Sequence, residues 1–286
     1  MGYRSFIGAT MLAAVLSAPP GAQAFDESKY PDLKGQWRRT NTGNPLRIGL
    51  PWDQTRPVGL GQEAPLTPEY QAIYEANLRD QAEGGQGTDP TFTCLSPGMP
   101  RVMIAYAPME VVVTPETTYI LMEQIHDNRR IHTDGRSFPT NMDDDPQFSG
   151  YSIGKWLDED GDGRYDTLEV ETRGMKGPRV FDASGIPLHK DNKTVVKERI
   201  YLDKANKDLM LNEITVIDHA FTQPWSVTKH YQRIPNDRWY EDNCAENNNH
   251  IIIGKENYFM SGDGYLMPAR KDQAPPDLRY FKQTRK

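Results

Sequence analysis

The sequence predicts a mainly β protein: an antiparallel barrel with one N-terminal helix and long loops. Apolar and polar side chains alternate from Arg101 onward, which is the period of half-buried strands. The 22 prolines and 23 glycines are spread along the chain and favour short strands and turns over a helical bundle. About ten antiparallel strands with short connections predict a closed or nearly closed barrel, because closure removes exposed strand edges.

Residues 1–24 have the pattern of a secretory signal peptide. Arg4 makes the start positive, an apolar run follows, and Ala22-Gln23-Ala24 forms a small-x-small cleavage site. We therefore expect a periplasmic or secreted protein, and no later run approaches the ~20 apolar residues of a membrane span. Loss of Arg4 changes the formal net charge from −7 to −8, which argues against a nucleic-acid partner.

Three parts are expected after the signal peptide. Residues 25–93 hold a first strand, a loop and the helix, 94–250 the barrel, and 251–286 an extension that wraps the surface or frays. The helix begins after Thr67, which is an N-cap residue type, and stops at Gly84-Gly85. The expected strands are Arg101–Tyr106, Met109–Thr114, Thr117–Gln124, Asn128–Thr133, Tyr151–Trp156, Thr167–Thr172, Thr194–Leu202, Asp208–Ile217, Trp225–Ile234 and Arg238–Asp242.

Cys94 and Cys244 are the two cysteines of the chain. In an oxidising compartment an isolated pair predicts a disulfide. Such a bridge closes about 150 residues, and the chain-entropy model gives it roughly 5 kcal/mol of stabilisation. A reactive thiol pair is the alternative, but the chain lacks the CxxC spacing typical of one.

The sharpest chemical motif lies between two expected strands. Counted from Asp158, acidic residues stand at positions 1, 3, 5, 9 and 12, with Gly163 at position 6, which is the spacing of a calcium loop. The flanks alternate like strands, so we expect a solitary calcium-binding hairpin; the alternative is an acidic, solvated turn. The expected ligands are Asp158, Asp160, Asp162, Asp166 and Glu169, with Arg164 contributing its backbone carbonyl.

The mature chain opens with Gly35-Gln36-Trp37, a G-x-W that resembles the entrance of a lipocalin-like barrel. In that superfamily the Trp closes one end of the barrel and an Arg from a late strand packs over it. The resemblance implies this role for Arg233 or Arg238. A buried Trp without that meaning is the alternative.

Further blocks are similar to those of an exported proteobacterial family of uncharacterised function. They include CLSPGMP at 94–100, RRIHTDGR at 129–136 and GYSIGKW at 150–156. The resemblance implies a secreted, β-rich, lipocalin-like (calycin-type) fold and no settled activity. The hairpin here is longer than the W-E-G-D-T-L turn of that family, so calcium binding would belong to this branch.

Function-capable side chains concentrate between Glu123 and Arg136. By alternation Arg130, His132 and Asp134 share one strand face, where they could bind a carboxylate or move a proton. The alternative is a turn at Asp134-Gly135, with Arg136 in an ion pair. No H-x-H or H-x-x-x-H spacing occurs, so a zinc site is not expected; the histidines are His126, His132, His189, His219, His230 and His250.

The function favoured by these features is the binding of a small, largely apolar molecule. Arg130 or Arg136 would recognise its anionic end, and Trp156 and Trp225 would line its cavity. The alternative is an enzyme for hydration, dehydration or isomerisation, in which His132 and Asp134 transfer the proton. A third reading is a calcium-stapled partner of an envelope protein complex.

Overall fold

The computed structural model describes residues 25–40, 64–83, 85–105, 107–124, 128–235, 238–244, 249–253, 256–261, 263–270 and 272–276. The predicted signal peptide, most of the long loop and His126 lie outside the described residues. None of the helices within these ranges is long and apolar enough to cross a membrane.

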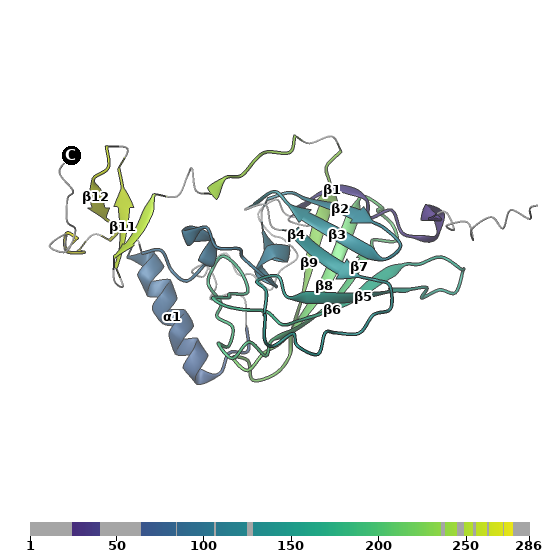
Figure 1. Cartoon of the computed structure of the whole chain (residues 1–286), viewed down its shortest axis with the longest axis horizontal. Coiled ribbons are helices and arrows are strands. Elements are labelled where there is room, and N and C mark those ends of the chain that lie inside the picture. The colour runs from purple at the N-terminus through teal and green to yellow at the C-terminus, as the bar shows by residue number, and fades with distance from the viewer. Residues whose placement is uncertain are drawn as a thin grey trace, which may run out of the picture.

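Nine strands form a closed barrel, each hydrogen-bonded to its neighbour in sequence (Figure 1). This confirms the mainly β class and the barrel. The strands are β1 Gly35–Arg39, β2 Met109–Val113, β3 Thr117–Met122, β4 Asn128–His132, β5 Tyr151–Leu157, β6 Thr167–Arg173, β7 Val195–Leu202, β8 Leu209–Ile217 and β9 Trp225–Arg233.

The barrel is mixed rather than strictly antiparallel. β4 and β5 run parallel, with Ile131 opposite Ser152, whereas all other neighbours are antiparallel. An odd number of strands in sequence order cannot close with every neighbour antiparallel. The connection 133–150 returns the chain to the end from which β4 started, as a parallel pair requires.

The helix is confirmed, and one expected strand is wrong. α1 spans Pro68–Ala82, and the Thr67 hydroxyl accepts the Tyr70 amide at 3.4 Å. Short 3-10 helices are η1 Glu27–Lys29, η2 Pro90–Thr93 and η3 Arg101–Ile104. η3 replaces the strand expected from Arg101. All four of its residues are buried, whereas a strand with one face toward the core would bury only alternate residues. No strand is assigned to 238–242.

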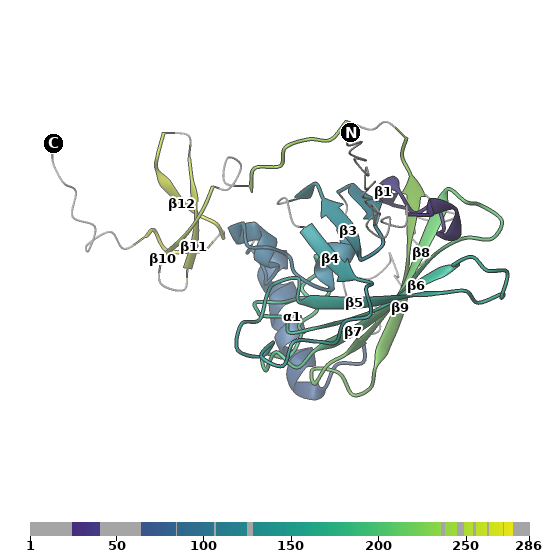
Figure 2. The same cartoon turned by 45° about the vertical axis from the view of Figure 1, so that its right-hand side comes forward.

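The C-terminal part contains a sheet that the sequence analysis did not predict. β10 His250–Ile253, β11 Glu256–Met260 and β12 Leu266–Pro268 pair antiparallel and lie beside one end of α1 (Figures 1 and 2). The Arg270 guanidinium joins them, since it contacts Asp80 of α1 at 3.1 Å and Glu256 at 2.7 Å. The disulfide between Cys94 and Cys244 is formed, with a Cα–Cα distance of 5.5 Å.

The barrel interior holds an ion pair within an apolar core. The Arg129 guanidinium donates to both carboxylate oxygens of Glu198, and the two side chains are 1% and 0% exposed. Ser152, Thr172 and Asn212 complete the network. A cavity inside the barrel, found among the described residues, measures about 10 Å³, which is room for about one water molecule.

Trp37 and Arg233 close one end of this barrel. Trp37 is fully buried and its indole Nε1 donates to the Leu33 carbonyl at 2.8 Å. The Arg233 guanidinium lies 4.3 Å from the indole ring centre and donates to the Lys34 carbonyl at 2.7 Å. Arg233, rather than Arg238, therefore occupies the position that the G-x-W resemblance implies.

Candidate functional site

The loop between β5 and β6 wraps around the side chain of Asp158. One carboxylate oxygen accepts the Gly161 amide at 2.7 Å and the other accepts the Gly163 amide at 2.9 Å. Both glycines have positive φ, 75° and 87°, a conformation that costs glycine little and other residues more. The loop backbone therefore fixes the orientation of the Asp158 carboxylate.

Three loop carboxylates converge. Asp158, Asp160 and Asp166 each place an oxygen within 4.8 Å of the other two. Backbone amides orient the other two as well, because Asp160 accepts from Asp162 at 3.2 Å and Asp166 accepts from Glu159 at 2.9 Å. Calcium ligands at about 2.3–2.6 Å from the ion lie at most about 5 Å apart. The separations of the three oxygens are within this limit.

Two expected ligands lie outside this group. Asp162 accepts the Arg164 amide at 2.8 Å and is not one of the three carboxylates that converge. Glu169 is exposed on β6, in register between Lys155 and Arg199 on the outer face. A helix would bring position 12 back to the ion, whereas a strand that starts at Thr167 carries it away.

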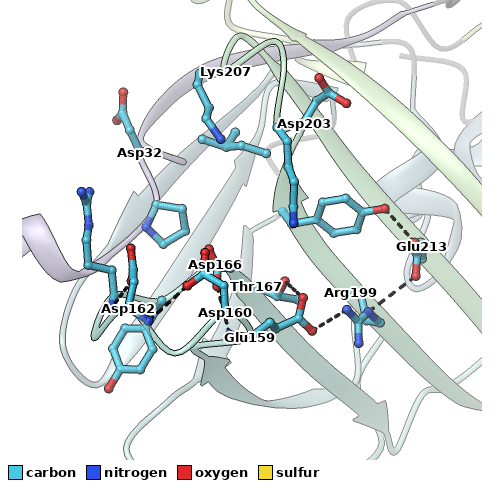
Figure 3. A pocket seen from close by; sticks show the side chains of 16 residues that line it. Asp32, Glu159, Asp160, Asp162, Asp166, Thr167, Arg199, Asp203, Lys207 and Glu213 are labelled. Carbon is cyan, nitrogen blue, oxygen red and sulfur yellow. Dashed lines mark hydrogen bonds and ion pairs between the residues drawn. The ribbon is translucent and has the colours of Figure 1, made fainter.

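A pocket of about 830 Å³ adjoins the loop (Figure 3). Its walls come from the loop, from Pro31 and Asp32 after η1, and from the turn between β7 and β8. Seven acidic side chains line it against four basic ones, so its charge favours cations. The lining residues are Pro31, Asp32, Glu159, Asp160, Asp162, Arg164, Tyr165, Asp166, Thr167, Arg199, Tyr201, Leu202, Asp203, Lys204, Lys207 and Glu213.

A chain of contacts crosses the pocket from the loop to β8 (Figure 3). Glu159 accepts from the Arg199 guanidinium at 2.6 Å, and Arg199 Nε lies 3.6 Å from Glu213. The Tyr201 hydroxyl donates to Glu213 at 2.7 Å. Burial and this hydrogen bond raise the pKa of Tyr201 to about 12. Arg199, one of the four basic residues that line the pocket, is therefore already paired with acids.

The face expected to hold Arg130, His132 and Asp134 is the outer face of β4. Arg136 Nε donates to both oxygens of Asp134 at 2.9 Å, and this hydrogen-bonded pair lowers the pKa of Asp134 to about 2. Arg130 lies over the Tyr119 ring at 5.9 Å. The structure thus places Asp134 in an ion pair with Arg136, as the alternative interpretation expected.

His132 packs against the Tyr151 ring at 4.9 Å. Its Nδ1 is buried and has no hydrogen-bond partner within the described ranges. Burial and the nearby Arg136 lower the pKa of His132, so the ring is neutral near pH 7. The Asp134 carboxylate is already paired with Arg136, so it is poorly placed to exchange a proton with the neutral imidazole of His132.

The two tryptophans expected to line a cavity are packed in the core instead. Trp156 contacts the rings of Tyr30 at 5.2 Å and Tyr165 at 6.2 Å. Trp225, toward the other end of the barrel, contacts Phe181 at 4.4 Å and Phe221 at 5.6 Å. Trp156 connects the β5–β6 loop, through Tyr165, to the segment after η1.

No protein family and no curated protein matches this chain. The resemblance to an exported proteobacterial family, drawn from short blocks, stays a prediction. The site must therefore be interpreted from its own geometry.

One group of side chains was missed. His189 and Asp191, from the connection between β6 and β7, meet His219, from the connection between β8 and β9. The sequence contains no pair of closely spaced histidines at this position, because two separate connections supply the two rings. The only local signal was the H-x-D spacing of His189 and Asp191.

Proposed function

We propose that this protein is an exported, lipocalin-like barrel whose β5–β6 hairpin binds a calcium ion. The observation that carries the proposal is the convergence of Asp158, Asp160 and Asp166, whose oxygens lie within 4.8 Å of one another. Three carboxylates at this spacing repel each other unless a cation or protons lie among them. Backbone amides already hold them in place, so little ordering is needed on binding.

Calcium would act as a staple at this end of the barrel. The loop is joined to the N-terminal segment, because the Tyr165 amide donates to the Lys29 carbonyl at 2.7 Å and the rings of Tyr165 and Tyr30 lie 5.1 Å apart. An ordered loop therefore orders the segment that leads into β1. The disulfide and the Arg233 contact with Trp37 support the exported and lipocalin-like parts of the proposal.

A ligand-binding role fits the pocket beside the loop better than the barrel interior. The interior cavity of about 10 Å³ has no room for an organic molecule, whereas the pocket of about 830 Å³ has ample room. We propose that a small molecule places its apolar part against Tyr165, Tyr201 and Leu202, which line the pocket. Since the loop forms one wall, calcium and ligand should affect each other's affinity.

Calcium titration by calorimetry, with melting curves with and without chelator, tests the staple. We expect saturable binding near ~10⁻⁴–10⁻³ M, as in extracellular modules, and a higher melting temperature with calcium. Asp158→Asn and Asp160→Asn should abolish both effects. Asp203→Asn is the matched control, because Asp203 lines the same pocket from another turn.

Glu169→Gln separates the two ways of assigning ligands. The twelve-residue spacing predicts that this variant loses calcium, whereas the outward position of Glu169 on β6 predicts that binding is retained. If the unmodified protein shows no binding heat and no shift of melting temperature, the loop is an acidic turn that does not bind calcium.

The enzyme alternative lacks a supporting observation. No hydrogen bond joins His132 to Asp134 in the described part of the chain, and Asp134 is paired with Arg136. Acid–base catalysis by these residues therefore stays a prediction.

A further inference from the structure

A second cluster of metal-ligating side chains lies at the barrel end away from the calcium hairpin. It joins the connection after β6, residues 174–194, to the connection after β8, residues 218–224. His189 Nδ1 lies 3.0 Å and His219 Nδ1 2.5 Å from the same atom, Oδ2 of Asp191. The three ligand atoms all lie within 4.8 Å of one another.

These separations are close to those of a metal site. In a tetrahedral site with metal–ligand bonds of about 2.0–2.2 Å, neighbouring ligand atoms are about 3.3 Å apart. The two measured distances to Asp191 Oδ2 are 3.0 and 2.5 Å. The third separation, between the ligand atoms of the two histidines, is at most 4.8 Å. Shifts of up to about 1.5 Å by side-chain rotation would therefore accommodate an ion.

The Nδ1 atoms of both histidines lie close to the same carboxylate oxygen. Either a proton on each ring or one metal ion must therefore satisfy the three atoms. The Asp191 amide also donates toward His189 Nδ1 at 3.2 Å. An imidazole nitrogen that accepts a hydrogen bond is unprotonated, and this is the form that binds metals.

The surroundings hold two of the three side chains in place. The His189 amide donates to Asp218 at 2.8 Å, and the Lys193 amide donates to the other oxygen of Asp191 at 3.0 Å. The ring of Tyr70, from α1, packs 5.3 Å from the His189 ring. The His219 side chain is 70% exposed, which leaves solvent free to complete the coordination.

We propose that His189, Asp191 and His219 bind a divalent transition-metal ion of the zinc type, with water in the remaining coordination position. Two imidazole nitrogens and one carboxylate oxygen suit zinc, copper or nickel and not calcium, which takes oxygen ligands. The ion would link two connections that lie on either side of the β7–β8 hairpin. This site does not depend on the calcium proposal, since it shares no residue with that loop.

Zinc titration of the full chain by calorimetry, in the presence of saturating calcium, tests the site. We expect saturable binding of zinc, weakened at least about tenfold in His219→Ala and in Asp191→Asn, because each removes one of three protein ligands. His250→Gln is the control, since His250 belongs to the separate C-terminal sheet. Melting curves without metal establish that the variants are folded.

Cobalt(II) supplies an independent readout in the unmodified protein. A visible absorption band of tetrahedral type that His219→Ala removes and His250→Gln retains would support the site. Zinc affinity unchanged in both His219→Ala and Asp191→Asn would overturn the proposal, as would zinc binding that disappears only in Asp158→Asn. In that case the histidines and Asp191 form only an ion-pair cluster.

Discussion

Lys229 is a cation inside the barrel. Alternation along β9 turns it inward with Val227 and Tyr231, and its side chain is buried, with the ammonium 5.7 Å from the centre of the Phe181 ring. Burial lowers its pKa to about 8, although Asp182 acts in the opposite direction. A charge held in this environment costs stability whenever it is protonated.

The pH dependence of stability follows from this pKa. The unfolded value is near 10.5 and the folded value about 8, so between these pH values the unfolded chain binds more protons and stability rises with pH. Below pH 8 the cost of the buried charge is fully present. We therefore expect Lys229→Met to raise the free energy of unfolding at pH 7 by about 1–3 kcal/mol.

Urea unfolding at pH 7 and pH 10 measures this effect. The advantage of Lys229→Met should shrink at the higher pH, where the native lysine has lost most of its proton. Lys155→Met serves as the control, because Lys155 is exposed on β5 and should change little at either pH. A variant less stable than the native protein at pH 7 would contradict the role assigned to Lys229.

At the residue scale, sequence predicts which side chains share a face but not which face is interior. Alternation correctly places Arg129 and Arg130 on opposite faces of the strand. Because both are arginines, the residue type does not tell which of the two points inward. The functional hypothesis used Arg130 and His132, whereas the structure buries Arg129 against Glu198. Ile131, which is fully buried, was the local signal, since an aliphatic side chain marks the inward face.

At the element scale, the contact of Arg233 with Trp37 fastens β1 into the barrel. The guanidinium stacks on the indole at 4.3 Å and donates to the Asp32 and Lys34 carbonyls at 2.6 and 2.7 Å. A planar guanidinium can make these contacts at once, whereas an ammonium is a point donor. β1 pairs with both β2 and β9, so this contact supports barrel closure.

We expect Arg233→Lys to lower the free energy of unfolding by about 1–3 kcal/mol, through loss of the stack and of at least one hydrogen bond. Arg238→Lys is the matched control, because Arg238 stacks on the exposed Tyr240 outside the barrel. The midpoint of urea unfolding measures both. Equal effects of the two substitutions would show that the Trp37 contact has no special part in closure.

Elements with strong local signals were predictable. The N-cap at Thr67 and the strands on either side of the acidic loop lie where the residue types indicate. η3 was not, because its buried run Arg101–Ile104 depends on the Arg101 ion pair with Asp89 at 3.0 Å. Such a tertiary contact leaves no periodic trace in the sequence.

At the scale of the whole molecule, the error in strand count changes the topology. The ten strands expected between Arg101 and Asp242, an even number, would allow every neighbour in a closed meander to be antiparallel. Removal of the expected strands at 101–106 and 238–242 and inclusion of β1 leave nine in the barrel. One parallel pair is then required, and β4 and β5 provide it. Closure was therefore predictable, but strand direction depended on every element being assigned correctly.

The disulfide links the two segments that flank strands β2 to β9. It joins Cys94, ahead of β2, to Cys244, after β9, across a sequence separation of 150 residues. Restricting so long a loop mainly lowers the entropy of the unfolded chain. Its loss should therefore reduce stability without changing the barrel itself.

We expect the double variant Cys94→Ser/Cys244→Ser to lose roughly 3–5 kcal/mol of unfolding free energy, the upper value being the chain-entropy limit. Guanidinium unfolding of the oxidised protein, of the protein with reductant and of the double variant measures this loss. Reductant should bring the native protein to the stability of the variant and leave the variant unchanged. A loss below about 1 kcal/mol would mean that residual structure in the unfolded chain already restricts the same loop.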